Sequence, residues 1–143
     1  MEVDGLKYEG KFYTRSGKEY SIEKGNGKAK EYNELNTLIF DGEYLNGEKN
    51  GKVKEYYNDG KLKFEGGYLN GKKNGKGKEY YDDGNLKFEG EFLNGKRNGN
   101  GKEYGYHRFK GEYFNGKRWN GEGKESDFSG EYYEGRWWNG IGV

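Results

Sequence analysis

The side chains that could do chemistry are few in this sequence. The only imidazole belongs to His107, and there is no cysteine to act as a nucleophile or to ligate zinc. A catalytic triad needs a histidine beside a hydroxyl nucleophile, and the sparse serines and threonines form no nucleophile motif. We therefore expect His107 to be a turn or surface residue, and we expect neither a catalytic residue nor a small-molecule substrate.

Two glycine-containing motifs resemble ligand sites but have the wrong context. A calcium loop needs acidic residues at alternate positions, a glycine and a distant glutamate, and Asp82-Asp83-Gly84 lacks that spacing. The Gly-x-Gly pairs precede expected strands, whereas a dinucleotide site needs them before a helix. The sequence therefore predicts no metal site and no cofactor, and it makes these aspartates turn residues.

The elements that carry these residues are copies of one unit. The phrase aromatic-x-Gly-x-aromatic starts at Tyr8, Phe40, Phe64, Phe88, Phe109 and Phe128, at intervals of 32, 24, 24, 21 and 19 residues. A period in the low twenties is typical of a repeat array. We expect one array over 1–143: a divergent first repeat at 6–39 with an insertion near 13–24, regular repeats at 40–63, 64–87 and 88–108, and short repeats at 109–127 and 128–143.

Each unit has the pattern of a β-hairpin. Leu86, Phe88, Gly90 and Phe92 alternate with charged residues, as in a half-buried strand. The Asn-Gly dipeptides at 94–95 and 98–99 favour the positive φ angles of tight turns, so we expect the chain to reverse there. Second strands are expected at 102–104 and, one unit earlier, at 76–81. The predicted fold is all-β: an elongated, twisted, single-layer antiparallel meander of stacked hairpins.

Aromatic rings supply most of the apolar surface, since the chain has 15 Tyr, 8 Phe and 3 Trp. A column of small residues accompanies them: Ala29, Val53, Gly77, Gly101, Gly123 and Gly142. Glycine within a strand often marks a close approach, so we expect the rings of one hairpin to lie over the small residues of its neighbour.

A single-layer sheet leaves a face to be covered, and the rings could either pack internally or line a groove for a partner. The predicted partner-binding groove consists of Tyr44, Phe64, Tyr68, Phe88, Phe92, Phe109 and Tyr113.

Charge is balanced overall, with 26 basic and 25 acidic residues, so we expect no nucleic-acid partner. Basic residues recur beside the Asn-Gly turns and predict one basic edge: Lys49, Lys72, Lys73, Lys96, Arg97, Lys117 and Arg118. Such charges could form cross-strand pairs, meet anionic lipid or meet an acidic protein.

The C-terminal end is rich in tryptophan, with Trp119, Trp137 and Trp138. An uncovered edge strand invites pairing, so this edge predicts self-association, a partner or continuation into a longer array; alternatively the tryptophans cover the last unit. No apolar stretch approaches the roughly 20 residues of a membrane span and the start lacks a signal peptide, which indicates a cytoplasmic protein or one peripherally bound at a membrane.

The repeated phrases YEGKF, FDGEY, FEGGY, FEGEF, FKGEY and FSGEY, with NGKVK and NGKGK after them, resemble MORN (membrane occupation and recognition nexus) repeats over nearly the whole chain. The resemblance implies a twisted sheet of stacked hairpins with an aromatic-lined groove, and roles in protein interaction or phosphoinositide binding. Tyr or Phe replaces the usual Trp of the first strand. The Lys- and Asn-rich sequence also resembles bacterial MORN-variant antitoxin or immunity proteins.

The predicted function is a non-enzymatic scaffold that binds a peptide or helix of a partner protein along its aromatic groove. One alternative is a peripheral membrane adaptor that binds anionic lipid through its basic edge. Another is a bacterial immunity or antitoxin protein that blocks a toxin.

Overall fold

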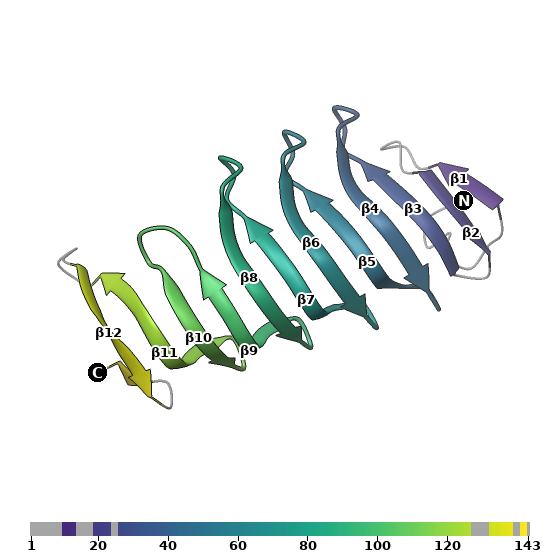
Figure 1. The fold of residues 1–143 in the computed structure, drawn as a ribbon. Coiled ribbons are helices and arrows are strands. Elements are labelled where there is room, and N and C mark those ends of the chain that lie inside the picture. The colour runs from purple at the N-terminus through teal and green to yellow at the C-terminus, as the bar shows by residue number, and fades with distance from the viewer. Residues whose placement is uncertain (1–9, 14–18, 24–25, 127–131, 139–140, 143) are drawn as a thin grey trace.

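The computed structural model describes residues 10–13, 19–23, 26–126, 132–138 and 141–142. Its strands form one 13-stranded antiparallel sheet in chain order, and the hairpins stand side by side along one long axis (Figure 1). The strands are β1 (Gly10–Tyr13), β2 (Glu19–Glu23), β3 (Asn26–Tyr32), β4 (Leu38–Leu45), β5 (Glu48–Tyr56), β6 (Leu62–Leu69), β7 (Lys72–Tyr80), β8 (Leu86–Leu93), β9 (Lys96–Glu103), β10 (Phe109–Phe114), β11 (Lys117–Ser126), β12 (Tyr132–Trp138) and β13 (Ile141–Gly142). The predicted all-β meander is confirmed. Within the predicted insertion near 13–24, β2 is described, whereas 14–18 and 24 lie outside the described residues.

In the four units that start at Phe40, Phe64, Phe88 and Phe109, the first Asn-Gly dipeptide makes the hairpin turn. Asn70 and Gly71 have φ angles of 50° and 79°, and Asn94 and Gly95 have 50° and 84°. Two successive positive φ angles define a type I′ turn, whose twist matches that of the strands it joins. The predicted reversal at 94–95 is confirmed.

The second Asn-Gly dipeptide of each unit does not reverse the chain, so that prediction was wrong. Asn98 and Gly99 lie inside β9, where the pairing with β8 passes from Gly90↔Gly101 directly to Phe92↔Arg97. This irregularity is a β-bulge, in which one strand has more residues than the partner strand opposite it. Gly99 takes a φ of 95° in the bulge. The second strands therefore start four to six residues earlier than predicted, at Lys72 in β7 and Lys96 in β9.

The turns at the opposite edge use aspartate, as predicted for Asp83. Asp59 Oδ1 accepts a hydrogen bond from the backbone N–H of Lys61 at 2.9 Å, and Asp83 Oδ1 accepts one from the N–H of Asn85 at 2.8 Å. An aspartate that bonds the backbone two residues on stabilises a turn locally. These carboxylates therefore stabilise the turns.

Hydrogen bonds also tie each hairpin to its neighbour. The N–H of Gly71 donates to the carbonyl of Lys49 at 3.0 Å, and the N–H of Gly95 donates to that of Lys73 at 2.9 Å. Near the opposite edge, the Tyr57 hydroxyl donates to the carbonyl of Tyr80 at 2.6 Å. Hydrogen bonds thus stabilise the stacking of the hairpins at both edges of the sheet, in addition to the backbone bonds between paired strands.

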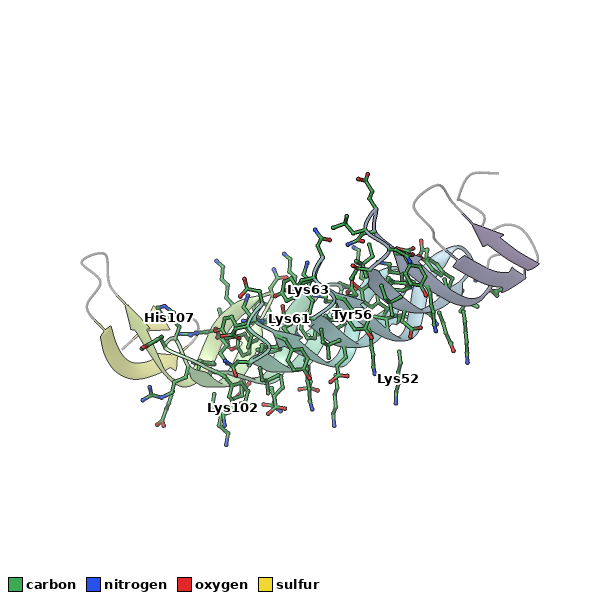
Figure 2. The ribbon with its side chains drawn as sticks, turned by 90° about the horizontal axis from the view of Figure 1, so that it is seen from above. Lys52, Tyr56, Lys61, Lys63, Lys102 and His107 are labelled. Carbon is green, nitrogen blue, oxygen red and sulfur yellow. The ribbon has the colours of Figure 1, made fainter. Side chains whose placement is uncertain are left out.

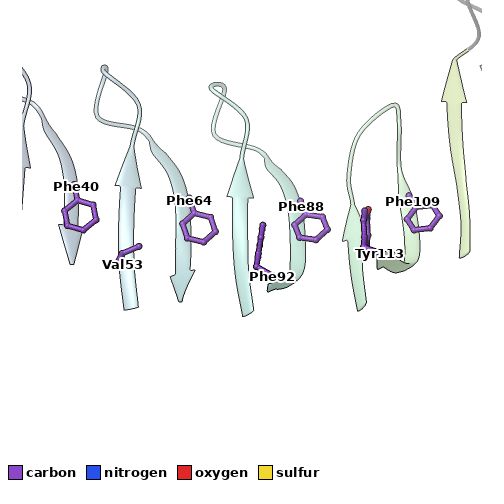
Figure 3. Close-up of a cluster of buried hydrophobic side chains, with 7 residues drawn as sticks. All are labelled: Phe40, Val53, Phe64, Phe88, Phe92, Phe109 and Tyr113. Carbon is purple, nitrogen blue, oxygen red and sulfur yellow. The ribbon is translucent and has the colours of Figure 1, made fainter. Parts of the chain in front are cut away.

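The core is a row of aromatic rings on one face of the sheet (Figure 3). Phe64 and Phe88 are 1% and 0% exposed. Phe92 of the later hairpin stands between them, edge to face with Phe64 at 5.6 Å and with Phe88 at 5.5 Å between ring centroids. Tyr113 repeats this contact against Phe88 at 5.2 Å. Aromatic pairs favour this geometry, so the rings form one continuous chain.

The small-residue column makes this ring packing possible. A Cβ at Gly77 would lie 2.8 Å from Phe64 of its own hairpin and 3.1 Å from Phe92 of the next. Both rings therefore reach the backbone at Gly77, which confirms the predicted packing and adds the ring of the same hairpin. In the equivalent place Val53 is 3% exposed, and Tyr68 of the next hairpin is only partly buried. A side chain in this column thus keeps the next ring from settling as deeply.

Candidate binding surface

A long, shallow hollow of about 1440 Å³ lies across the middle of the sheet, from Lys28 on β3 to Lys110 on β10. Its floor includes the small-residue positions, whose Cβ direction is toward the rings on the other face. Its walls carry charged side chains at the strand positions that alternate with the buried rings. We call this hollow the charged groove, and Figure 2 shows Lys52 and Lys102 of its walls projecting from the same side of the sheet.

One wall of the charged groove is a row of directly paired residues whose signs alternate. Strand register joins them in the order Lys30, Asp41, Lys54, Glu65, Lys78, Glu89, Lys102, Lys110 and Glu122. Opposite charges on paired positions contribute about 0.2–1 kcal/mol each to a sheet. The alternation fails once, where Lys102 of β9 pairs with Lys110 of β10.

The rings predicted to line a partner groove lie elsewhere. Phe64, Phe88, Phe92, Phe109 and Tyr113 are 0–6% exposed, while Tyr44 and Tyr68 are partly buried against them. Their surface is taken up by one another and by the backbone of the small-residue column, so these five rings present almost no area to a partner. Among the described residues the predicted groove rings belong to the core, and the hollow is lined by charged side chains instead.

The repeats match a known family. A model of the MORN repeat fits three consecutive stretches, residues 40–61, 64–86 and 88–106, which start at the phenylalanines that open the predicted repeats. Residues 40–106 are thus MORN repeats. MORN repeats are non-catalytic modules that generally mediate protein or membrane-lipid interactions. A search of curated proteins found no match to this chain.

In this array, four of the seven residues of the predicted basic edge face the core. The ammonium of Lys73 lies 4.3 Å from the centroid of the Phe64 ring, and the Arg97 guanidinium lies 4.1 Å from that of Phe88. Lys49 and Arg118 occupy the same place over Phe40 and Phe109 at 4.5 and 5.0 Å. Cations over ring faces are held electrostatically, so these four cover the core.

The other three residues of the predicted basic edge face solvent. Lys72, Lys96 and Lys117 are exposed and pair in register with Leu69, Leu93 and Phe114. Those apolar side chains, together with Leu45, are 46–56% exposed. We call this set the apolar stripe: Leu45, Leu69, Leu93 and Phe114. The sequence analysis missed this stripe, although its residues recur before the turns in YLNG, FLNG and YFNG.

Tyrosine hydroxyls are paired with glutamates along the core. The Tyr68 hydroxyl donates to Glu55 at 2.6 Å, and the Tyr44 hydroxyl donates to Glu31 at 2.8 Å. Burial and the Glu55 carboxylate raise the pKa of Tyr68 above its ordinary value, because both disfavour the phenolate. Where Phe92 has no hydroxyl, Arg97 donates to the corresponding Glu79 at 3.1 Å instead.

Glu103 is the most heavily coordinated of these carboxylates. It accepts hydrogen bonds from the Tyr113 hydroxyl and from Arg118 Nε, the latter at 2.8 Å, and Arg97 lies 3.5 Å away. Burial opposes its ionisation, but the bonds from Arg118 and Tyr113 outweigh it and lower the pKa of Glu103. The cluster joins the β8–β9 hairpin to the β10–β11 hairpin and is a structural contact.

The C-terminal edge is described only in part. Trp119 is half-buried and its ring lies 5.0 Å from that of Phe114, which extends the apolar stripe onto β11. Trp137 and Trp138 lie in β12, but their side chains are outside the described residues. His107 is exposed in the turn between β9 and β10, and its backbone carbonyl accepts a hydrogen bond from Arg118.

The search for chemistry in the described ranges found no built site. No three His, Cys, Asp or Glu side chains gather there in a way that could hold a metal ion. Over the same ranges, the structure has no helix that is long and apolar enough to cross a membrane. The arrangement offers surfaces for binding, and the charged groove is one of them.

Proposed function

We propose that this MORN repeat protein is a non-enzymatic scaffold that binds a segment of a partner protein along the charged groove. The observation that carries the proposal is the contrast between the two faces. The aromatic face is closed by its own rings and cations, whereas the opposite face holds a hollow about 1440 Å³ in volume with exposed charged walls. A partner can therefore be accommodated without disturbing the core.

The charges of the groove favour a protein partner over a uniform anionic surface. Seven lysines and five carboxylates line it, and they alternate in sign along a paired row. A nucleic acid or an anionic membrane would meet five carboxylates among the seven lysines, and each contact with a carboxylate costs electrostatic energy. A polypeptide can present both signs, and complementary charges fix orientation and speed association.

The test is capture of a partner by the tagged full chain from source-cell lysate at low and moderate salt, followed by mass spectrometry and binding measurements. One stoichiometric protein should bind. The groove variant Lys54→Gln/Lys78→Gln should bind it roughly 2- to 30-fold more weakly, as expected when two partly exposed ion pairs are lost.

A matched control carries the same charge change away from the groove. Lys61→Gln/Lys63→Gln removes two exposed lysines that do not line it (Figure 2), and this variant should bind normally. Equal loss in both variants would make the effect one of net charge and would refute the groove as the site. A captured toxin would assign the immunity function, with the groove as the surface to test first.

The apolar stripe favours one alternative, the peripheral membrane adaptor. Leu69, Leu93 and Phe114 alternate with exposed Lys72, Lys96 and Lys117 along one edge, a combination that suits the interface of an anionic bilayer. Flotation with vesicles of phosphatidylserine and phosphatidylcholine tests it. Binding that is lost in Leu69→Ser/Leu93→Ser, but kept in Lys54→Gln/Lys78→Gln, would place membrane attachment at this edge.

A further inference from the structure

The alternating row of the charged groove has a consequence for how a partner is positioned. Neighbouring strands are about 4.8 Å apart, so the same sign returns about every 9.6 Å, once in each hairpin. A partner that matched Lys54 and Glu65 would match Lys78 and Glu89 equally well after sliding by one hairpin. Within the regular repeats, charge alone therefore cannot fix the partner's register.

The single interruption of the row removes this ambiguity. Lys102 pairs directly with Lys110, and Lys110 pairs on its other side with Glu122. Like charges on paired positions destabilise a sheet. Replacing either lysine by glutamate would only move the conflict, because Glu89 lies opposite Lys102 and Glu122 lies opposite Lys110. The two lysines thus mark a boundary between two alternating stretches of opposite phase.

Both lysines are open to an external anion. Lys102 and Lys110 are exposed and both line the groove. Lys102 lies 4.8 Å from the centroid of the Tyr104 ring, and over the described residues neither lysine has a carboxylate within 4 Å. Their strand partners Glu89 and Glu122 offset the repulsion between the two lysines only in part, because neither forms a close ion pair with these lysines.

We propose that Lys102 and Lys110 form an acid-recognition site that sets the register of the bound segment. Its ligand is a pair of neighbouring acidic side chains in a partner segment whose other charges alternate. Two carboxylates over two paired lysines relieve the repulsion, and no other position along the described row from Lys30 to Glu122 offers this arrangement. The inference rests on the proposed scaffold function and specifies its partner.

The site can be tested before a partner is known, with an acetylated, amidated hexaglutamate peptide as the probe. Titrated into the labelled full chain at low salt and followed by NMR, it should shift the backbone amides of Lys102 and Lys110 more than those of Lys54 and Lys78. Lys102→Gln/Lys110→Gln should bind hexaglutamate roughly 2- to 30-fold more weakly, while Lys54→Gln/Lys78→Gln, with the same charge change, should bind it nearly as well as wild type.

Three results would overturn the site: no hexaglutamate binding by the wild type at low salt, equal shifts at all four lysines, or equal loss in the two variants. Loss of fold does not confuse the test, since Lys102→Gln/Lys110→Gln removes a repulsion and circular dichroism verifies the sheet. Failure to capture any partner would refute the scaffold function, and that result is separate from the hexaglutamate titration. With a partner in hand, removal of the two lysines should abolish discrimination between segments that differ only in their adjacent acids.

Discussion

Gly101 is the position where the packing of the core can be tested most directly. A Cβ there would lie 2.6 Å from Cε1 of Phe88 and 3.0 Å from Cε1 of Tyr113. Both rings are nearly inaccessible, at 0% and 4% exposure, and they contact each other edge to face. Neither can move without breaking a ring contact, so Gly101→Ala forces the two hairpins apart.

Two effects of opposite sign determine how much Gly101→Ala changes the free energy of unfolding. Overpacking a filled core costs typically 1–3 kcal/mol. Replacing glycine by alanine at a compatible backbone stabilises by about 0.4–1 kcal/mol through the unfolded chain. The clash is larger, and the net loss in the free energy of unfolding should be about 1–2 kcal/mol. For a chain of this size that corresponds to a fall in Tm of roughly 3–8 °C.

The assay is thermal and guanidinium unfolding followed by circular dichroism, with Phe88→Leu as the partner in a double-mutant cycle. Leucine lacks the ring carbons nearest the new methyl group, so Gly101→Ala should cost less in the Phe88→Leu background. A Gly101→Ala protein as stable as wild type, or additive losses in the cycle, would refute the claim that this glycine exists to admit the rings.

Three further predictions concern ionisation and turn geometry. Because the pKa of Glu103 is lowered in the fold, its contribution is present above the unfolded pKa and is lost as pH falls through the folded one; Glu103→Gln should flatten acid destabilisation, and an unchanged pH profile would contradict this. Burial and the Glu65 carboxylate raise the pKa of Tyr80 from 10.0 to about 12, so stability present below pH 10 should decline towards pH 12, less so in Tyr80→Phe, as absorbance-monitored unfolding would show. Asn94 has a φ of 50°, so Asn94→Ala should cost about 1 kcal/mol in guanidinium unfolding and Asn94→Gly much less; equal costs would refute the strain argument.

Local patterns were enough to predict the sheet, its turns and the inward parity of the rings. The alternation around Phe88 fixes one face of a strand, and Asn94-Gly95 has the chemistry of a type I′ turn. The second dipeptide, Asn98-Gly99, has the same residue types but lies inside β9 and does not form a hairpin turn. Its conformation depends on how β9 pairs with β8 at the bulge, and this pairing cannot be predicted from the dipeptide alone.

The site was harder to predict because it depends on which face each charge occupies. Lys72 and Lys73 are adjacent in the sequence, yet Lys72 is exposed and Lys73 lies over Phe64. Strand alternation contains this signal, and it would have divided the basic edge correctly. The charged groove could not be predicted in this way, since it lies between rows of charged side chains that only the strand register brings side by side.

The hydrogen bond from each hairpin turn to the carbonyl of the preceding hairpin makes the array extensible. Gly71 and Gly95 donate to Lys49 and Lys73 in equivalent ways, so a further copy of residues 64–87 can be inserted without altering either junction. Each copy would lengthen the groove by about 9.6 Å, two strand spacings. It would also move the Lys102–Lys110 pair away from the N-terminal repeats by the same step. Repeat number thus acts as a ruler that sets the distance between the recognition site and the start of the array.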